Sequence, residues 1–190
     1  MGVLSDEQVW ARVLAGDAAL FGVIWDRHRD RVFRHLLGAG TGRNDAEDLT
    51  AVVFLELWRR RGTARFVDGS VLPWLLVTAV NVARNARRSR NRFRAFLARL
   101  PEPSPAPDAA QVLWGEFSGS RAERLGPALD GLGGRDRALL GLTAVEGFPV
   151  GQAAVALGMS EAAARMRLSR LRRRLRAEIG AEATMEGERG

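Results

Sequence analysis

The chain has 190 residues, of which 46% are hydrophobic, and this length suits one or two small domains better than a multi-domain enzyme. All 29 of its cationic Lys and Arg positions are Arg, against 22 Asp and Glu, which gives a net charge of +7 and a pI of about 11.4. This balance favours a polyanionic partner, and the absence of cysteine excludes disulfides, thiolate zinc sites and a cysteine nucleophile.

The sequence predicts neither a metal site nor a membrane span. Its only histidines, His28 and His35, are too few for an imidazole-rich metal site, so we expect no cofactor. We interpret both as surface or partly packed residues, with a pH switch as the alternative. The longest uncharged stretch, Gly69–Ala83, has 15 residues, fewer than the roughly 20 that cross a bilayer. Since the amino terminus resembles no leader, we expect a cytoplasmic protein without membrane contact.

Residues 1–100 are predicted to form an all-α domain of four helices. Ser5 can cap a first helix that ends near Gly16, and Asp17 can cap a second. Large apolar side chains on or beside the helical stripes are assigned to the core of this domain: Trp10, Leu20, Ile24, Trp25, Phe33, Trp58 and Trp74.

A third helix is predicted to begin at Asn44 and to end at Gly62. Its first turns carry three carboxylates that favour the positive end of a helix, namely Asp45, Glu47 and Asp48. The preceding Gly38–Gly42 segment lacks the strand and the Lys of a phosphate-binding loop, so we interpret it as a turn between helices.

The fourth helix is predicted to run from Val71 into an Arg-rich segment. Its inward stripe consists of Leu75, Ala79, Val82 and Ala86. The opposite face carries Asn81, Arg84, Asn85 and Arg88, and the patch continues with Arg87, Arg90 and Arg92. Forked Asn and Arg side chains match base edges and phosphates, which indicates DNA binding; the alternative is a solvated helix end.

Residues 101–119 are predicted to be a linker, because four prolines alternate from Pro101 to Pro107. A second helical domain is placed at 120–180, followed by an acidic tail at 181–190. Within this domain, short helices are expected over 121–130 and 135–146, ended by Gly131 and Gly147 respectively.

A helix-turn-helix follows in the second domain. Val150–Leu157 is predicted to be a short helix, Gly158-Met159 a tight turn, and Ser160 the N-cap of a helix that runs to about Glu178. The inward stripe of this last helix consists of Ala164, Leu168, Leu171 and Leu175. Its outer face then presents Ala162, Arg165, Met166, Arg170, Arg173 and Arg176. We interpret this face as a DNA reader, with a solvated basic face as the alternative.

These segments resemble a bacterial sigma factor of the extracytoplasmic-function type. Asp45–Leu49 and Phe54–Arg59 resemble the region 2 signature that docks on RNA polymerase in relatives. The resemblance therefore implies polymerase binding by Asp45, Glu47, Asp48, Leu49, Phe54, Glu56, Leu57 and Trp58. Pro73–Leu75 and Ala83–Asn85 resemble the part of region 2 that reads and opens the minus-ten element.

Two further parts of the resemblance concern DNA. The loop 62–70, which carries Arg65 and Phe66, lies where relatives capture a flipped base. Glu146–Phe148, Gln152–Ser160 and Arg165–Leu168 resemble region 4, whose helix-turn-helix reads the minus-thirty-five element; this match adds Arg167 and Ser160 to the candidates. The resemblance implies three partners: core RNA polymerase, promoter DNA and an anti-sigma factor.

The sequence therefore predicts a non-enzymatic promoter-specificity subunit, since we find no catalytic constellation in it. A free-standing helix-turn-helix regulator, which binds operator DNA without polymerase, is the alternative. A general nucleic-acid chaperone is a third hypothesis, against which the helix-turn-helix spacing speaks.

Overall fold

A computed structural model of the chain describes residues 4–98 and 131–187. The regular elements of this part are helices, and its one β contact is an isolated bridge between Val67 and Ser70, so the all-α prediction is confirmed. The predicted linker and the helix predicted over 121–130 lie outside the described residues. None of the helices in 4–98 and 131–187 has the length and apolar character needed to cross a bilayer.

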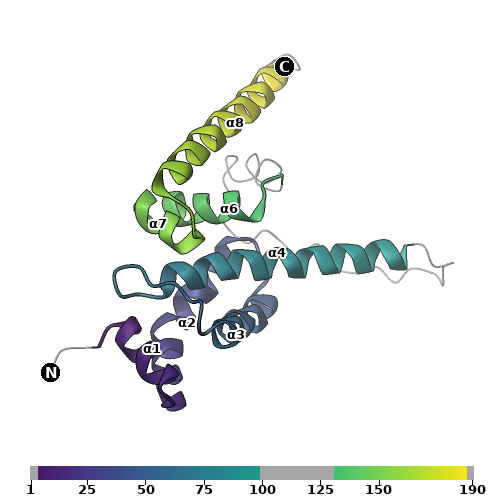
Figure 1. Cartoon of the computed structure of the whole chain (residues 1–190). Helices are drawn as coiled ribbons and strands as arrows, with labels where there is room; N and C mark the ends of the chain where they lie inside the picture. The colour runs from purple at the N-terminus through teal and green to yellow at the C-terminus, as the bar shows by residue number, and fades with distance from the viewer. Residues whose placement is uncertain (1–3, 99–130, 188–190) are drawn as a thin grey trace.

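The first domain contains α1 (Asp6–Leu14), the 3-10 turn η1 (Ala18–Leu20), α2 (Phe21–Gly38), α3 (Arg43–Arg59) and α4 (Leu72–Leu97), shown in Figure 1. The predicted Ser5 cap is confirmed, because the backbone N–H of Gln8 donates to Ser5 Oγ at 3.2 Å and the Gln8 side chain accepts from the Ser5 N–H. Two other caps were wrong. Asp17 precedes η1 but its side chain makes no capping hydrogen bond. Helix α3 begins at Arg43 with Gly42 as its N-cap residue, so the cap lies two residues before the predicted Asn44.

The core of the first domain lies where α1, α2, α3 and the first half of α4 meet. Trp10 and Trp74 are buried in it, while Trp25 and Trp58 are half-buried against it, as the sequence predicted. An aromatic cluster fills the centre, with Phe21 edge-on to Trp58 at a centroid distance of 5.5 Å. This packing joins α1 and α2 to α3.

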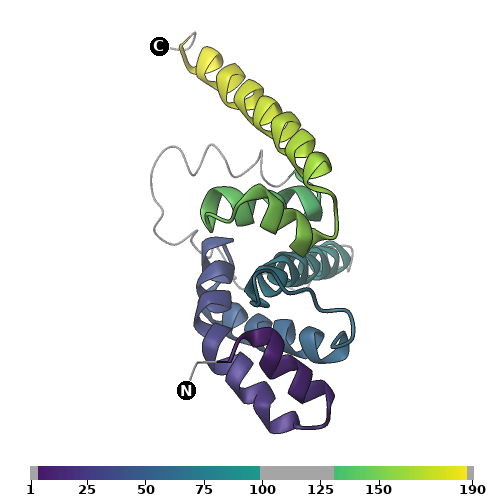
Figure 2. The ribbon, with the colours of Figure 1, turned by 60° about the vertical axis from the view of Figure 1, so that its left-hand side comes forward.

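The second domain contains α6 (Gly134–Leu140), a π-helical turn η2 (Gly141–Val145), α7 (Val150–Leu157) and α8 (Glu161–Gly187). The helix predicted over 135–146 is therefore interrupted by the π turn, in which the N–H of Glu146 donates to the carbonyl of Gly141. The last helix runs past the predicted end at Glu178 into the segment assigned to an acidic tail. In Figures 1 and 2, α8 projects from the body as a long free rod.

The second domain packs directly against α4, which sequence reasoning did not predict. Its buried cluster includes three side chains of the first domain, namely Val67, Leu76 and Val80. Helices α6 and α7 both lie along α4 in Figures 1 and 2, and η2 also contacts it. The prediction of two helical domains left their relative placement open, and the structure places them in contact: α4 serves both cores, because its buried residues extend around more than one stripe.

Candidate nucleic-acid interface

The turn between α7 and α8 has the geometry that the sequence predicted. Gly158 adopts a left-handed backbone with φ of +64°, and Ser160 Oγ accepts a hydrogen bond from the N–H of Ala163 at 3.2 Å. On the inner side of α8, Ala164, Leu168 and Leu171 are buried, and Leu175 is half-buried. Since these residues fix the rotation of α8, the opposite side of the helix faces solvent.

Most candidates on α8 lie on this open side. The exposed members are Ser160, Ala162, Arg165, Met166, Arg170 and Arg173. Met166 is 61% exposed, which leaves an apolar side chain free at the centre of a basic surface. Arg167 differs: it is half-buried and forms an ion pair with Asp136 of α6. Its predicted place on the DNA-facing side is therefore corrected, because it faces the body of the domain.

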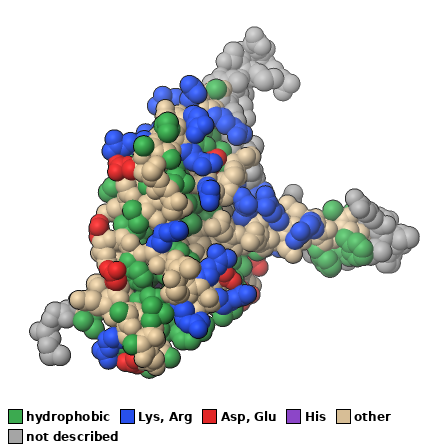
Figure 3. All heavy atoms as spheres, viewed as in Figure 1, with side chains coloured by type: hydrophobic (Ala, Val, Ile, Leu, Met, Phe, Trp, Pro, Cys, Tyr) green, Lys and Arg blue, Asp and Glu red, His purple; other side chains and the backbone are tan. Residues whose placement is uncertain are grey.

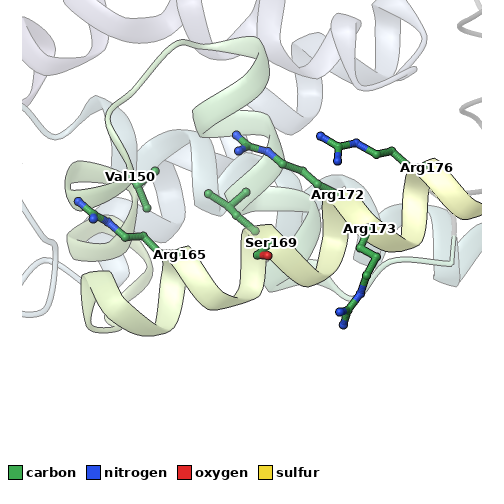
Figure 4. A pocket seen from close by; sticks show the side chains of 7 residues that line it. Val150, Arg165, Ser169, Arg172, Arg173 and Arg176 are labelled. Atoms are coloured by element: carbon green, nitrogen blue, oxygen red, sulfur yellow. The ribbon is translucent and has the colours of Figure 1, made fainter.

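A hollow lies between the start of α7 and the middle of α8. Its lining consists of Val150, Arg165, Leu168, Ser169, Arg172, Arg173 and Arg176. Figure 4 shows Arg165, Arg172 and Arg176 on one side of α8, with Arg173 pointing to another. Guanidinium groups at successive turns suit a row of phosphates, because each can donate two parallel hydrogen bonds.

The candidates on α4 are less uniformly open. Asn81, Asn85, Arg87, Arg88 and Arg90 are exposed, and Arg90 forms an ion pair with Asp45 of α3. Arg84 is half-buried, and its Nε is buried without a hydrogen-bond partner among the described residues. Figure 3 shows Arg side chains over α8 and along α4 on the same face of the molecule.

The covering of Arg84 comes from the second domain. Gly134, the first residue of α6, lies so close that a Cβ atom on it would be 2.8 Å from Arg84 Nη1 and 3.0 Å from Asn81 Oδ1. Glycine lets α6 approach this closely, and a larger residue at this position would displace the flexible ends of the Arg84 and Asn81 side chains. Further along, a Cβ atom on Gly158 would be 2.8 Å from Arg65 Cζ.

The two loop candidates lie in different environments. Arg65 is exposed beside the α7–α8 turn. Phe66 is half-buried and packs on the core of the first domain. Of the two loop residues that the resemblance suggested for base capture, Phe66 is therefore the less accessible one, because its ring packs in part on apolar neighbours.

The candidates on α3 divide in the same way. Glu47 and Asp48 are exposed, while Asp45, Leu49, Glu56 and Trp58 are half-buried. Glu56 pairs with Arg59 and Arg60 of its own helix at 3.3 and 3.1 Å. The side chains of Phe54 and Leu57 are buried, at 2% and 0% exposed, so the prediction that they contact a partner is wrong.

Two apolar residues of α3 that sequence reasoning missed are open to solvent. Val52 is 38% exposed and Leu55 is 54% exposed, on the side of α3 away from the core. The buried residues Ala46, Thr50, Val53, Phe54 and Leu57 follow helical spacing. That periodicity could have identified Leu55 as outward-facing, since it falls outside the buried stripe.

Asp6 is a third missed residue, and it is buried at the start of α1. Its carboxylate accepts from His28 Nε2 at 2.6 Å, from Arg27 at 2.9 Å, and from Ser70 and the backbone N–H of Val71, both at 3.1 Å. Burial alone would raise the pKa of Asp6, but the hydrogen bonds from His28, Arg27 and Val71 outweigh it and hold that pKa well below its usual range. The group joins α1, α2 and the start of α4.

Glu146 forms a matching group between the domains. His35 Nδ1 donates to Glu146 Oε1 at 2.7 Å, and Arg31 Nε donates to Oε2 at 2.8 Å. Burial alone would raise the pKa of Glu146, but these bonds from His35 and Arg31 lower it overall. Sequence reasoning missed both histidine contacts, because the partners lie 22 and 111 positions away in the chain. Within 4–98 and 131–187, His, Asp and Glu form no cluster that could hold a metal ion.

Comparisons with known proteins agree with this two-part organisation. The sequence matches Sigma-70 region 2 over residues 24–93 and Sigma-70 region 4 over residues 122–175. It is 32% identical over 161 residues to the RNA polymerase sigma factor CarQ of Myxococcus xanthus, an alignment that covers 84% of this chain and 89% of CarQ. It is also 28% identical over 158 residues to the ECF RNA polymerase sigma factor BldN of Streptomyces coelicolor, covering 80% of this chain but 57% of BldN.

Two solved structures share the fold. CnrH, solved in complex with the cytosolic domain of CnrY, aligns with a TM-score of 0.56 and 24% identity, covering 93% of this chain and 97% of that one. The sigma factor RpoE of Bartonella quintana, solved with the anti-sigma factor NepR, aligns with a TM-score of 0.53 and 20% identity, covering 84% of this chain and 96% of RpoE. With both regions matched and most of CarQ covered, the chain belongs to the sigma-70 family of RNA polymerase sigma factors, in the extracytoplasmic-function group.

Proposed function

We propose that this protein binds core RNA polymerase and directs it to promoters through two DNA-binding helices. The observation that carries the proposal is that each of the two family-matched regions contains one long helix, and that most arginines described on these two helices are exposed to solvent. Arginine suits both tasks, because it stays charged and donates bidentate hydrogen bonds to guanine and to phosphate. No step of this function requires catalysis by the chain itself, so the protein acts as a non-enzymatic subunit. Its place of action in this proposal is the cytoplasm, where it meets polymerase and promoter DNA.

In this proposal α3 supplies the polymerase contact. Its outer side combines the carboxylates Glu47 and Asp48 with the exposed apolar residues Val52 and Leu55. An apolar centre with a charged rim is the usual composition of a protein interface. The acidic residues would steer the helix toward a basic partner surface, and Leu55 would supply the buried contact.

The DNA contacts are divided between α4 and α8. Asn81, Arg84, Asn85 and Arg88 of α4 act on the minus-ten element, with Arg87, Arg90 and Arg65 along the backbone. Ser160, Ala162, Arg165 and Met166 in the first turns of α8 enter the major groove at the minus-thirty-five element, and Arg170 and Arg173 contact phosphates. RpoE and CnrH were solved with bound partners, in the case of RpoE an anti-sigma factor, and we propose a partner of that kind for this chain as well.

Run-off transcription tests the proposal. Core polymerase is mixed with a genomic promoter library, with or without the full chain, and new start sites are mapped. We expect discrete starts that need the chain; no chain-dependent start across the library would overturn the proposal. A gel shift without polymerase separates the alternative, because a free-standing regulator binds specific DNA tightly on its own whereas a sigma subunit does not.

A further inference from the structure

The loop 62–70 is tied to helix α1 at both of its ends. Before the loop begins, the indole N–H of the buried Trp10 donates to the backbone carbonyl of Arg61 at 3.0 Å. Where the loop ends, the backbone N–H of Glu7 donates to the carbonyl of Gly69 at 3.2 Å. The first helix of the chain therefore holds both ends of a segment whose first anchor lies 51 positions further along the sequence.

Asp6 adds a third tie at the end of the loop. Its side chain is 5% exposed, and its carboxylate accepts from Ser70 Oγ and from the backbone N–H of Val71, both at 3.1 Å. From α2, Arg27 and His28 donate to the same carboxylate at 2.9 and 2.6 Å. A carboxylate has about four acceptor positions, so these four donors satisfy it. Asp6 thus joins the end of the loop to α2 through charge-assisted hydrogen bonds.

The backbone at the end of the loop needs such support. Val67 and Ser70 exchange two backbone hydrogen bonds, at 2.9 and 3.0 Å, around a two-residue turn. Both turn residues are left-handed, with φ of +49° for Asp68 and +75° for Gly69. A left-handed residue other than glycine is uncommon, and it persists where its surroundings hold it. A Cβ atom on Gly69 would lie 3.2 Å from Ser5 Cβ, so the cap of α1 packs closely against this turn.

Side chains within the loop alternate between the core and solvent. Ala64 and Phe66 pack on the first core, and Val67 is buried. Arg65, between two inward-facing residues, is exposed. Because its neighbours are packed and the ends of the loop are held, the backbone of Arg65 is fixed and its side chain is left to meet a ligand. A guanidinium on a fixed backbone makes directed contacts, whereas the same group on a loose loop supplies charge alone.

We propose that Asp6 and Trp10 of α1 are positioning residues, which hold the loop so that Arg65 meets the DNA backbone of the minus-ten element at a fixed point. This inference rests on the proposed function and deepens it. Both positioning residues are buried, so neither contacts DNA itself. Contacts to phosphates set the register of a protein on its DNA. Helix α1 therefore contributes to promoter binding without touching the promoter.

A double-mutant cycle on the holoenzyme tests the proposal. The probe is a labelled promoter fragment from the run-off experiment, with the bases of its minus-ten element unpaired. Arg65→Ala should weaken binding about tenfold, as expected for one lost charged contact, and Asp6→Asn should weaken it by a similar factor. The double variant should also lose about tenfold, because Arg65 is already misplaced when Asp6 is changed. A loss of about a hundredfold, the product of independent effects, would overturn the proposal.

The sign of the effect separates positioning from simple electrostatics. Asp6→Asn removes a negative charge, and by charge alone it would strengthen DNA binding. Asp30→Asn removes the same charge from a side chain that is 82% exposed, and it should bind DNA at least as tightly as the parent. If Asp6→Asn binds as tightly as Asp30→Asn, the positioning role is wrong.

Trp10→Phe tests the start of the loop with a smaller change. It keeps an aromatic ring in the core but removes the hydrogen bond to Arg61, so binding should weaken about threefold. The matched control, Trp25→Phe, makes the same change at a ring that packs on Phe54 and should leave DNA binding unchanged. Equal losses in the two variants would assign the effect to core packing and contradict the role of Trp10.

Hydrogen exchange of the full chain without polymerase reports on the loop directly. The backbone N–H groups of Ser70 and Val71 should exchange about tenfold faster in Asp6→Asn, relative to any change in α3. The same factor in the loop and in α3 would indicate a general loss of stability and would contradict positioning. If circular dichroism shows that Asp6→Asn is misfolded, Ser70→Ala removes one bond to the same carboxylate and decides the question in the same direction.

The two kinds of measurement separate this inference from the proposed function. If run-off transcription yields no chain-dependent start, the proposed function fails, and hydrogen exchange still decides whether α1 holds the loop. If transcription succeeds but the effects of Asp6→Asn and Arg65→Ala multiply, the sigma role stands and the positioning role fails.

Discussion

Helices α4 and α8 carry the same chemistry but differ in how much of it is open. Both place several arginines on one side and an apolar stripe on the other. On α8 the basic side is open along the described residues, apart from Arg167, which pairs with α6. On α4 the basic side is partly covered, with Arg84 half-buried beside Gly134. A basic helix face is thus a property of sequence, whereas its availability depends on what packs beside it.

The difference follows from how many cores each helix serves. The apolar stripe of α8 packs mainly on α6 and α7 of its own domain. In contrast, α4 gives Leu75 and Ala79 to the first core and Leu76 and Val80 to the second. A helix buried on two adjacent sides has less surface left for a ligand, and the edge of its polar face lies next to the second domain.

The largest effect is expected from truncating the shared side of α4. Leu76 is fully buried, so Leu76→Ala should lower the free energy of unfolding by about 3 kcal/mol through reduced burial and the cavity left behind. Leu97→Ala, at the exposed end of the same helix, should change it by less than about 0.5 kcal/mol. Urea unfolding followed by circular dichroism measures both; equal effects would show that α4 does not serve the second core.

The next effect concerns the α4 face. Arg84→Ala with Arg88→Ala should reduce promoter opening about 100-fold, because each forked contact to a base contributes about 1–3 kcal/mol. Affinity for core polymerase should stay unchanged, because the proposed polymerase contact is made by α3. Permanganate footprinting measures opening and fluorescence titration measures core binding. A loss of core affinity without a change in opening would reverse the assignment of this face.

A smaller effect is expected on the open face of α8. Arg170→Ala with Arg173→Ala should weaken binding to upstream duplex DNA about tenfold and reduce the slope of log affinity against log salt by about 2, because each variant leaves one phosphate without its arginine. Binding is measured with the holoenzyme at several salt concentrations. Arg167→Ala provides the contrast, because its pairing with Asp136 predicts lower stability of the second domain with little change in the salt slope.

Mild acid should have the smallest effect. The folded-state pKa of Asp6 is lowered, so its contribution to stability is complete above the ordinary carboxylate pKa of about 3.9 and is lost as pH falls toward the lower folded value. Stability attributable to Asp6 should therefore be constant from pH 7 to 5 and fall below about pH 4. Urea unfolding at each pH should show that the free energy of unfolding of Asp6→Asn falls less steeply below pH 4 than that of the parent chain. The same fall in both proteins would contradict this role of Asp6.

Local patterns predicted much of the fold and the site. The Ser5 capping box, the Gly158 turn, the Ser160 cap and the buried stripe of α8 follow from neighbouring residues and helical spacing, and each was confirmed. The Asn44 cap was wrong because Gly42 leads into the helix before the polar residues begin. Phe54 and Leu57 were assigned to a partner by resemblance, although their spacing places them in the buried stripe.

By itself, the sequence determined the helices, their apolar and basic sides, and the family, because caps, periodicity and motif spacing act over a few residues. The tertiary structure alone decided that Glu146 meets His35 and Arg31, that Gly134 lies against Arg84, and that one helix serves two cores. Such contacts join residues more than a hundred positions apart in the case of Glu146. No local pattern encodes them, since they arise only when two folded surfaces fit together.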